Sequence, residues 1–266
     1  MTRRLAWIVT ALVTVFLLVP IVVIVPVAFN ASPYIEFPPS GLSLRWFENF
    51  FTSPEWVEAA LVSLRVAAIT TVLATVLGTL TAIGLTRTRA RYLGVVNAVI
   101  ALPMIVPMVA YALGVYAVYV HFGLVGSMTG LIVAHTVLAL PYVVLNVSAP
   151  LQTLNPNVER AARSLGASPV RAFLTVILPQ IAPGVMAGAL FAFLTSFDEV
   201  VVAIFVTNQE TTTLPVKMWE SVQTDLDPTI AAVATMLIVT TSILLGGSAL
   251  LGRKNRDESA HDDADA

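Results

Sequence analysis

Two adjacent carboxylic acids, Asp198 and Glu199, stand inside a stretch of the sequence that is otherwise apolar, residues 181–206. This stretch is long enough to cross a membrane as a helix. Burying one carboxylate near the centre of such a helix costs about 2.5–3.5 kcal/mol. At about 1.5 Å per residue, Asp198 falls roughly 22 Å along a helix counted from Pro183, beyond the middle of the membrane. Both side chains must therefore face protein or water.

The chemistry of two adjacent carboxylates leaves several interpretations open. They can form a structural pair that hydroxyl groups or Arg65 satisfy, or stand at a helix end that water reaches. They can also line the path of a cationic solute, or only one of them can matter. Small residues at every fourth position favour contact with protein, because they allow helices to pack closely, and both acids fall near this face. The small residues are Gly184, Gly188, Ala192 and Ser196.

Two aromatic residues, Tyr111 and Trp219, are further candidates for contact with a cation. Aromatic faces attract ammonium groups, but tyrosine and tryptophan also anchor helices at membrane surfaces. Tyr111 lies in the apolar stretch 95–120. Trp219 follows residues 181–206 in a polar segment, where docking to an external protein and contact with the membrane edge are equally open.

The sequence lacks the motifs of an enzyme. It contains no cysteine, and its histidines (His121, His135 and His261) do not have metal-ligand spacing. We find no Gly-x-x-x-x-Gly-Lys phosphate loop and no His-Glu-x-x-His motif. We therefore expect no catalytic residue, no metal site and no ATP hydrolysis by this chain. His135 is expected to be a hydrogen-bonded residue that packs between helices.

The elements that must position these residues are apolar stretches of membrane-spanning length. Of 266 residues, 57% are hydrophobic and 11% are charged, and the mean hydropathy is +0.86, which is typical of a membrane protein. Pro103 and Pro107 must bend or break the third span, and the charged tail at 252–266 is predicted to be disordered. The six predicted spans are residues 5–29, 61–86, 95–120, 128–149, 181–206 and 229–251.

Basic residues predict the orientation of these spans. Six spans put both termini on one side. If the termini and the loops 87–91 and 150–180 are cytoplasmic, 11 of the 14 Lys and Arg residues lie inside the cell. That distribution satisfies the positive-inside rule. We therefore predict a multi-pass protein of the cell membrane with both termini in the cytoplasm.

The polar segment at residues 155–179 carries helix boundary signals of its own. Asn155–Pro156 and Ser168–Pro169 are typical helix starts, and Gly166 suits the left-handed residue just past a helix end. Pro179 is expected to end the second short helix. Helices this short are marginal alone in water, so the segment is either a capped connector or a docking surface for a soluble partner. The apolar side chains at helical spacing are Val158, Ala161, Ala162 and Leu165, then Val170, Phe173, Leu174 and Ile177.

The same segment resembles the EAA loop of ABC importer permeases. The run Glu159–Gly166, followed by Ile177–Pro179, is similar to the family pattern of Glu-Ala-Ala, a later Gly and a hydrophobic-x-Leu-Pro. In that family the loop forms coupling helices that sit in a cleft of a cytoplasmic ATPase. One residue departs from the pattern, because Arg160 stands where the family has Glu. The resemblance then implies either a partner of altered charge or contact through Glu159. It assigns ATPase coupling to Glu159, Arg160, Ala161, Ala162, Gly166 and Pro179.

A second pair of motifs narrows the resemblance. Residues 196–202 and 213–218 are similar to the spermidine/putrescine-type branch of these permeases, and the likeness runs through about residues 5–251. It implies an all-α, MetI-like fold in which residues 1–251 form six transmembrane helices with cytoplasmic coupling helices. Asp198 and Glu199, and with less weight Tyr111 and Trp219, would line the path of a polyamine.

The resemblance also implies partners. They are a dimer of cytoplasmic ATPases that binds ATP-Mg, a second permease subunit, an extracytoplasmic solute-binding protein and membrane lipid, with no nucleic acid. This chain itself would need no cofactor. Two rival functions stay open: a permease for an iron complex, a phosphonate or an inorganic anion, and a proton-coupled carrier that uses Asp198 as its proton site.

Overall fold

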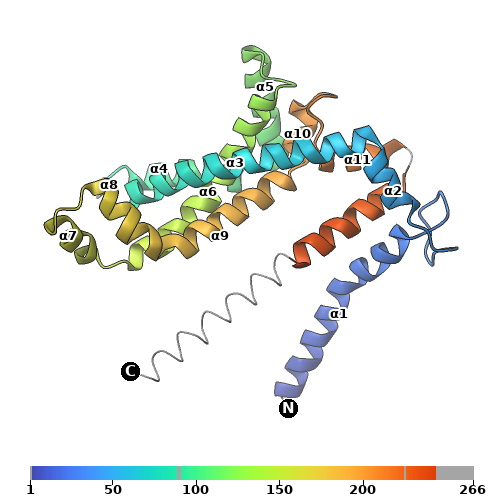
Figure 1. Cartoon of the computed structure of the whole chain (residues 1–266), viewed down its shortest axis with the longest axis horizontal. Helices are drawn as coiled ribbons and strands as arrows, with labels where there is room; N and C mark the ends of the chain where they lie inside the picture. Colours follow the sequence, from blue (N-terminus) through green and yellow to red (C-terminus); the bar gives the residue numbers. More distant parts are fainter. Residues whose placement is uncertain (1, 89–90, 225, 244–266) are drawn as a thin grey trace. The chain divides into compact units, whose positions relative to one another are not determined.

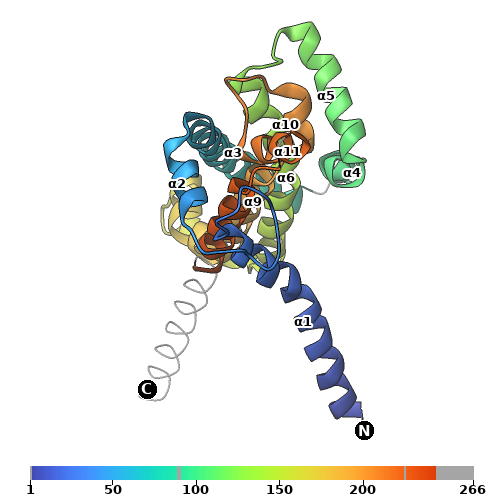
Figure 2. The same ribbon diagram turned by 90° about the vertical axis from the view of Figure 1, so that its right-hand side faces the viewer.

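The computed structural model describes residues 2–88, 91–224 and 226–243. Within these ranges the chain is all-α, apart from loops and one isolated antiparallel bridge between Asn30 and Leu42. It divides into two compact units, which are the described parts of residues 1–57 with 220–266 and of residues 58–219. Figures 1 and 2 draw the elements of both units.

The helices vary in length from single turns to membrane-spanning elements. Local signals set several of their ends: Ser127 caps α6 by accepting a hydrogen bond from the backbone N–H of Gly130, and the left-handed Gly123 ends α5. The elements are α1 (Thr2–Ala28), α2 (Arg45–Thr52), α3 (Pro54–Arg87), α4 (Leu93–Ile105), α5 (Met108–Phe122), α6 (Met128–Thr153), α7 (Pro156–Ser164), α8 (Pro169–Ala172), the π-helix η1 (Phe173–Ile177), α9 (Leu178–Phe197), α10 (Val201–Val206) and α11 (Leu214–Thr224).

Several of these helices have the length and composition of membrane spans. Among the described residues, four qualify: Arg3–Ala28, Pro54–Arg87, Met128–Thr153 and Pro169–Phe197. The pair α4 and α5 makes a fifth if it is counted as one span, and Thr229–Ile243 is a shorter apolar helix. Residues 244–251 of the predicted sixth span, and the predicted disordered tail at 252–266, lie outside the described residues.

The predicted third span is broken, as its prolines required. Helix α4 ends at Ile105, α5 begins at Met108, and their axes differ by 104° (Figure 2). Pro107 precedes the first residue of α5, and Val106 before it has extended backbone angles. A proline disfavours helical angles in the residue before it, which accounts for the extended Val106 at this turn. Pro103, in contrast, is accommodated inside α4.

Pro179 does not end the second short helix, so that prediction was wrong. Residues Pro169–Phe197 run as one continuous helical segment through α8, η1 and α9. The backbone N–H of Leu178 donates to the carbonyl of Phe173, five residues back. This wider π turn lies directly before Pro179, whose ring would clash with a carbonyl in a regular α-helix, and it allows the helix to continue.

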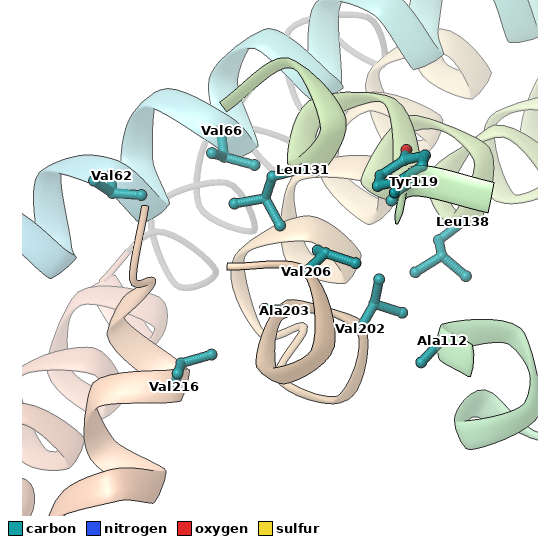
Figure 3. Packing of buried hydrophobic residues seen from close by; sticks show 11 residues of the cluster. Val62, Val66, Ala112, Tyr119, Leu131, Leu138, Val202, Ala203, Val206 and Val216 are labelled. Atoms are coloured by element: carbon teal, nitrogen blue, oxygen red, sulfur yellow. The ribbon is translucent and has the colours of Figure 1, made fainter. Parts of the chain in front are cut away.

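Buried apolar side chains of residues 58–219 form two clusters. The first surrounds α10, where Val202 and Val206 pack with Val66 of α3 and Leu131 of α6 (Figure 3). The second cluster joins α6 to η1 and α9 through residues such as Val143 and Ile181, both fully buried. Helices α6 and α9 thus lie side by side (Figure 1). In the other unit, Val27 and Ala28 at the end of α1 pack with Trp46 of α2 and with Ala231.

Candidate functional site

The two adjacent acids lie in a break between helices and not inside a helix. Helix α9 ends at Phe197, Asp198 follows it with φ −92° and ψ 0°, and α10 begins only at Val201. The helix expected over residues 181–206 is therefore interrupted at this point. The carboxylate of Glu199 accepts hydrogen bonds from the backbone N–H groups of Val202 (2.7 Å) and Ala203 (2.9 Å). A new helix start exposes such N–H groups, and Glu199 satisfies them.

Glu199 is buried next to His135 of α6. The side chains are 3% and 0% exposed, and Glu199 Oε2 lies 3.5 Å from His135 Nε2. On the other side of the imidazole, His135 Nδ1 lies 2.9 Å from Ser196 Oγ of α9. The expected role of His135, a hydrogen-bonded residue between packed helices, is confirmed. The break between α9 and α10 is thereby fastened to α6 by polar groups.

Asp198 differs from its neighbour in exposure, because its side chain is exposed while Glu199 is buried. It also follows the last turn of α9, where carbonyl groups without intrahelical partners give the helix end a partial negative charge. A carboxylate at this position adds to that negative charge and does not balance it. The exposed end of α9 therefore favours a cation.

The predicted face of small residues is confirmed as the contact between α9 and α6. A Cβ atom at Gly184 would lie 2.5 Å from the carbonyl oxygen of Asn146, and one at Gly188 would lie 3.1 Å from Cα of Val143. Ala192 and Ser196, on the same face, are buried. The two backbones approach each other so closely because these positions carry almost no side chain.

The aromatic candidates lie on other elements. The hydroxyl of Tyr111 on α5 donates to the backbone carbonyl of Ala134 on α6 (3.1 Å), and its ring packs against the cluster around α10. Tyr111 also lines an open groove of about 390 Å³ between α5 and α6 whose wall is otherwise mainly apolar. Trp219 lies on α11, and 49% of its surface is exposed.

The segment 155–179 forms the predicted short helices, α7 and α8, at one end of the long helices of its unit (Figure 1). The side chain of Asn155 accepts a hydrogen bond from the backbone N–H of Asn157 (3.0 Å), and Ser168 caps α8 in the same way through Arg171 (3.3 Å). Gly166 has φ +91°. The predicted start signals and the left-handed glycine are all present.

The apolar side of α7 packs only in part inside the described chain, where Ala162 is half-buried. Leu165 is 89% exposed and Val158 is 37% exposed. In the second short helix, Val170 and Leu174 are also exposed, whereas Ile177 is fully buried against the second cluster. We expected the apolar faces of both short helices to pack against other residues. Within the chain this is so mainly at Ile177, where the second short helix continues into α9.

Two polar pairs of the site were not predicted from the sequence. Arg87, at the end of α3, holds Glu159 of α7 through two contacts of 2.6 and 3.3 Å. Glu199 and His135 form the other pair. Both join residues that are distant along the chain, so no local pattern points to them.

Comparison with known families decides the kind of protein. The family described as "Binding-protein-dependent transport system inner membrane component" matches residues 74–256, more than half of the chain. The chain belongs to this family. It is thus a permease component of an ABC importer, an inner-membrane protein with several apolar helices, and a transport subunit that is not an enzyme.

Relatives and solved structures agree with this assignment. The permease is 33% identical over 240 residues to the spermidine/putrescine transport system permease protein PotC of Haemophilus influenzae, covering 90% of this chain and 93% of that protein. It is 32% identical over 230 residues to the putrescine transport system permease protein PotI of Escherichia coli K12, covering 84% and 82%. A solved bacterial ABC transporter that imports alginate has a similar fold, with a TM-score of 0.73 at 15% identity over 93% of this chain and 96% of that one.

Proposed function

We propose that the permease moves a polyamine across the inner membrane and that Asp198 contacts the cation. The observation that carries the proposal is the exposed carboxylate of Asp198 at the C-terminal end of α9. Broken helices whose ends point at a solute are a common way for transporters to bind ions near the middle of the membrane. The relatives named above, PotC and PotI, bear spermidine and putrescine in their names.

Glu199 has a different role in this proposal. Its two oxygens are engaged by the backbone of α10 and it is buried beside His135. It holds the break in place and so positions Asp198 next to it. Tyr111 and Trp219 stay candidates for the path. Because the hydroxyl of Tyr111 already donates to Ala134, a contact with a cation would be a cation–π contact with its ring.

The proposed complex has the partners of an ABC importer. The permease pairs with a second permease, receives its solute from an extracytoplasmic binding protein and rests on a dimer of ATPases that binds ATP-Mg. In the proposed arrangement of six spans, both termini and the segment 155–179 lie in the cytoplasm. This orientation agrees with the positive-inside rule, because most Lys and Arg residues then lie on the cytoplasmic side. Closure of the ATPases moves α7 and α8, and the continuous segment Pro169–Phe197 carries this movement to Asp198.

The role of Asp198 is tested by Asp198→Asn in membrane vesicles that contain the whole complex. We expect the initial rate of ATP-driven spermidine uptake at subsaturating concentration to fall about five- to tenfold, because an exposed charge contact at moderate dielectric is worth about 1 kcal/mol or slightly more. The loss should be smaller for putrescine, which carries fewer charges. Labelled spermidine and putrescine provide the measurement.

The matched control for this experiment is Glu210→Gln, which removes an exposed carboxylate outside the break. It should transport like the wild type. Equal uptake by Asp198→Asn and the wild type would exclude Asp198 from the path. Absence of polyamine uptake by the wild type would instead favour an ABC importer permease for another solute.

The coupling role of the 155–179 segment is tested at Gly166. A β-branched residue is strained at φ +91°, so we expect Gly166→Val to shift α8 relative to α7. Stimulation of ATP hydrolysis by the binding protein should fall at least about tenfold, since small misplacements can have effects of this size. Gly94→Val is the control, because a Cβ atom there meets nothing within 4 Å and its φ is not positive. Normal coupling in Gly166→Val would disprove the proposed role of the turn.

A further inference from the structure

One side of α7 is partly covered by the rest of the chain, and the opposite side, here called the outward side, is exposed. At about 100° per residue, Glu159 and Ala162 lie about 60° apart, and both are only partly exposed. On the other side, Arg160, Ala161, Ser164 and Leu165 share an arc of about 140°. All four are exposed. Arg160, which replaces the Glu of the EAA pattern, is therefore on the side available to a partner.

Glu159 does not supply the missing negative charge on that side. Its carboxylate is bound by both terminal nitrogens of Arg87, at 2.6 and 3.3 Å, and its side chain is only 19% exposed. The pair fastens α7 to the end of α3. A partner approaching the outward side of α7 meets Arg160 and not a free glutamate.

The neighbouring exposed residues are basic or apolar. Arg163 and Arg171 are exposed, and Leu165, Val170 and Leu174 are 89%, 67% and 53% exposed. Phe173, in contrast, packs against the second cluster inside the chain. We call the outward set the docking face: Arg160, Arg163, Leu165, Val170, Arg171 and Leu174.

We propose that the docking face binds a cleft of the cytoplasmic ATPase in which carboxylates surround an apolar floor. The proposal rests on the proposed function, in which this segment couples the permease to that ATPase. Exposed arginines without a free acid among them favour negative charge opposite, since like charges across an interface are strongly unfavourable. The charge pattern is the reverse of the one that the EAA glutamate implies.

A reversed pattern also gives specificity. An ATPase whose cleft is basic, and so suits a glutamate, would place like charge opposite Arg160 and Arg163. Repulsion of this kind is one of the ways in which interfaces exclude wrong partners. The permease would thus reject the ATPases of importers that carry the usual glutamate.

A lipid surface is the other occupant that arginines and apolar residues could fit. Helices that lie on lipid carry large side chains such as Trp, Phe and Leu along their apolar side. The outward side of α7 carries the small Ala161 and Ser164 beside Leu165, and the aromatic Phe173 points into its own chain. A cleft in a protein fits this mixture of small and large side chains better than a lipid surface does.

The test uses the complete complex with an affinity tag on the permease. Arg160→Glu is expected to lower the amount of ATPase that copurifies at physiological salt by at least about tenfold, and Arg160→Gln by less. Wild-type retention should weaken as salt rises. The control is Arg91→Glu, which makes the same charge change at an exposed residue of the α3–α4 connection.

A single thiol separates this inference from the proposed function. The chain has no cysteine, so Leu165→Cys provides a unique site for crosslinking to the ATPase. Crosslinking together with unchanged or stronger retention of Arg160→Glu would overturn the acidic cleft and leave the coupling role intact. Absence of crosslinking in the complete complex, with a fluorophore on Leu165→Cys quenched by spin-labelled anionic phosphatidylglycerol, would overturn both.

Discussion

Glu199→Leu is expected to destabilise the permease strongly and to abolish uptake. The substitution leaves the buried N–H groups of Val202 and Ala203 without their acceptor and removes the partner of His135. Each buried polar group left unsatisfied costs about 1–3 kcal/mol. Heating the purified complex in detergent, followed by tryptophan fluorescence, should show a lower unfolding temperature than that of the wild type.

A second variant separates the structural role of Glu199 from direct contact with the solute. Glu199→Gln keeps one acceptor oxygen and should be intermediate in stability and in uptake. Asp198→Asn should lose uptake at wild-type stability. If Glu199→Leu lost uptake while its unfolding temperature stayed unchanged, Glu199 would act on the solute itself and the assigned positioning role would be wrong.

Gly184→Leu is the other substitution with a large expected effect. Its Cβ atom would lie 2.5 Å from the carbonyl oxygen of Asn146 and 2.7 Å from Cγ of Pro150. Both are rigid parts of α6, so the two helices must separate, at a cost of about 1–3 kcal/mol or more. We expect Gly184→Leu to aggregate on detergent extraction, or to unfold at a temperature well below that of the wild type. Size-exclusion chromatography of heated samples measures both outcomes.

Gly84→Leu is the matched control for the helix contact. A Cβ atom at Gly84 meets nothing within 4 Å, so the same increase in size should leave the elution profile unchanged. Equal behaviour of the two variants would mean that α6 and α9 do not require the small residues of α9 in order to pack.

The close contact of α6 and α9 connects these predictions. The same face of α9 that carries Gly184 ends at Ser196, which binds His135 beside Glu199. Displacing α9 from α6 therefore also disturbs the break in which Asp198 lies. Close packing, and not hydrophobic burial, is the main force between helices in lipid, so the position of the acid depends on small residues several turns away.

Features that depend on neighbours along the chain could be predicted from the sequence. Asn155, Ser168 and Gly166 act within a few residues, and each has the predicted role in the structure. The break at Pro107 and the small face of α9 follow from the shape of single residues. The apolar stretches likewise show which segments suit a membrane, because length and composition alone decide that.

The tertiary structure alone decided where the fifth span stops and which acid stays exposed. Residues 200–206 are as apolar as the helix before them, so hydropathy has no boundary at Phe197. The break exists because Glu199 caps α10 and meets His135 from a distant helix. Glu159 is likewise neutralised by Arg87, which lies 72 positions away. Contacts between distant residues form only after helices pack, and so the charge that the permease offers its partners is a property of the fold.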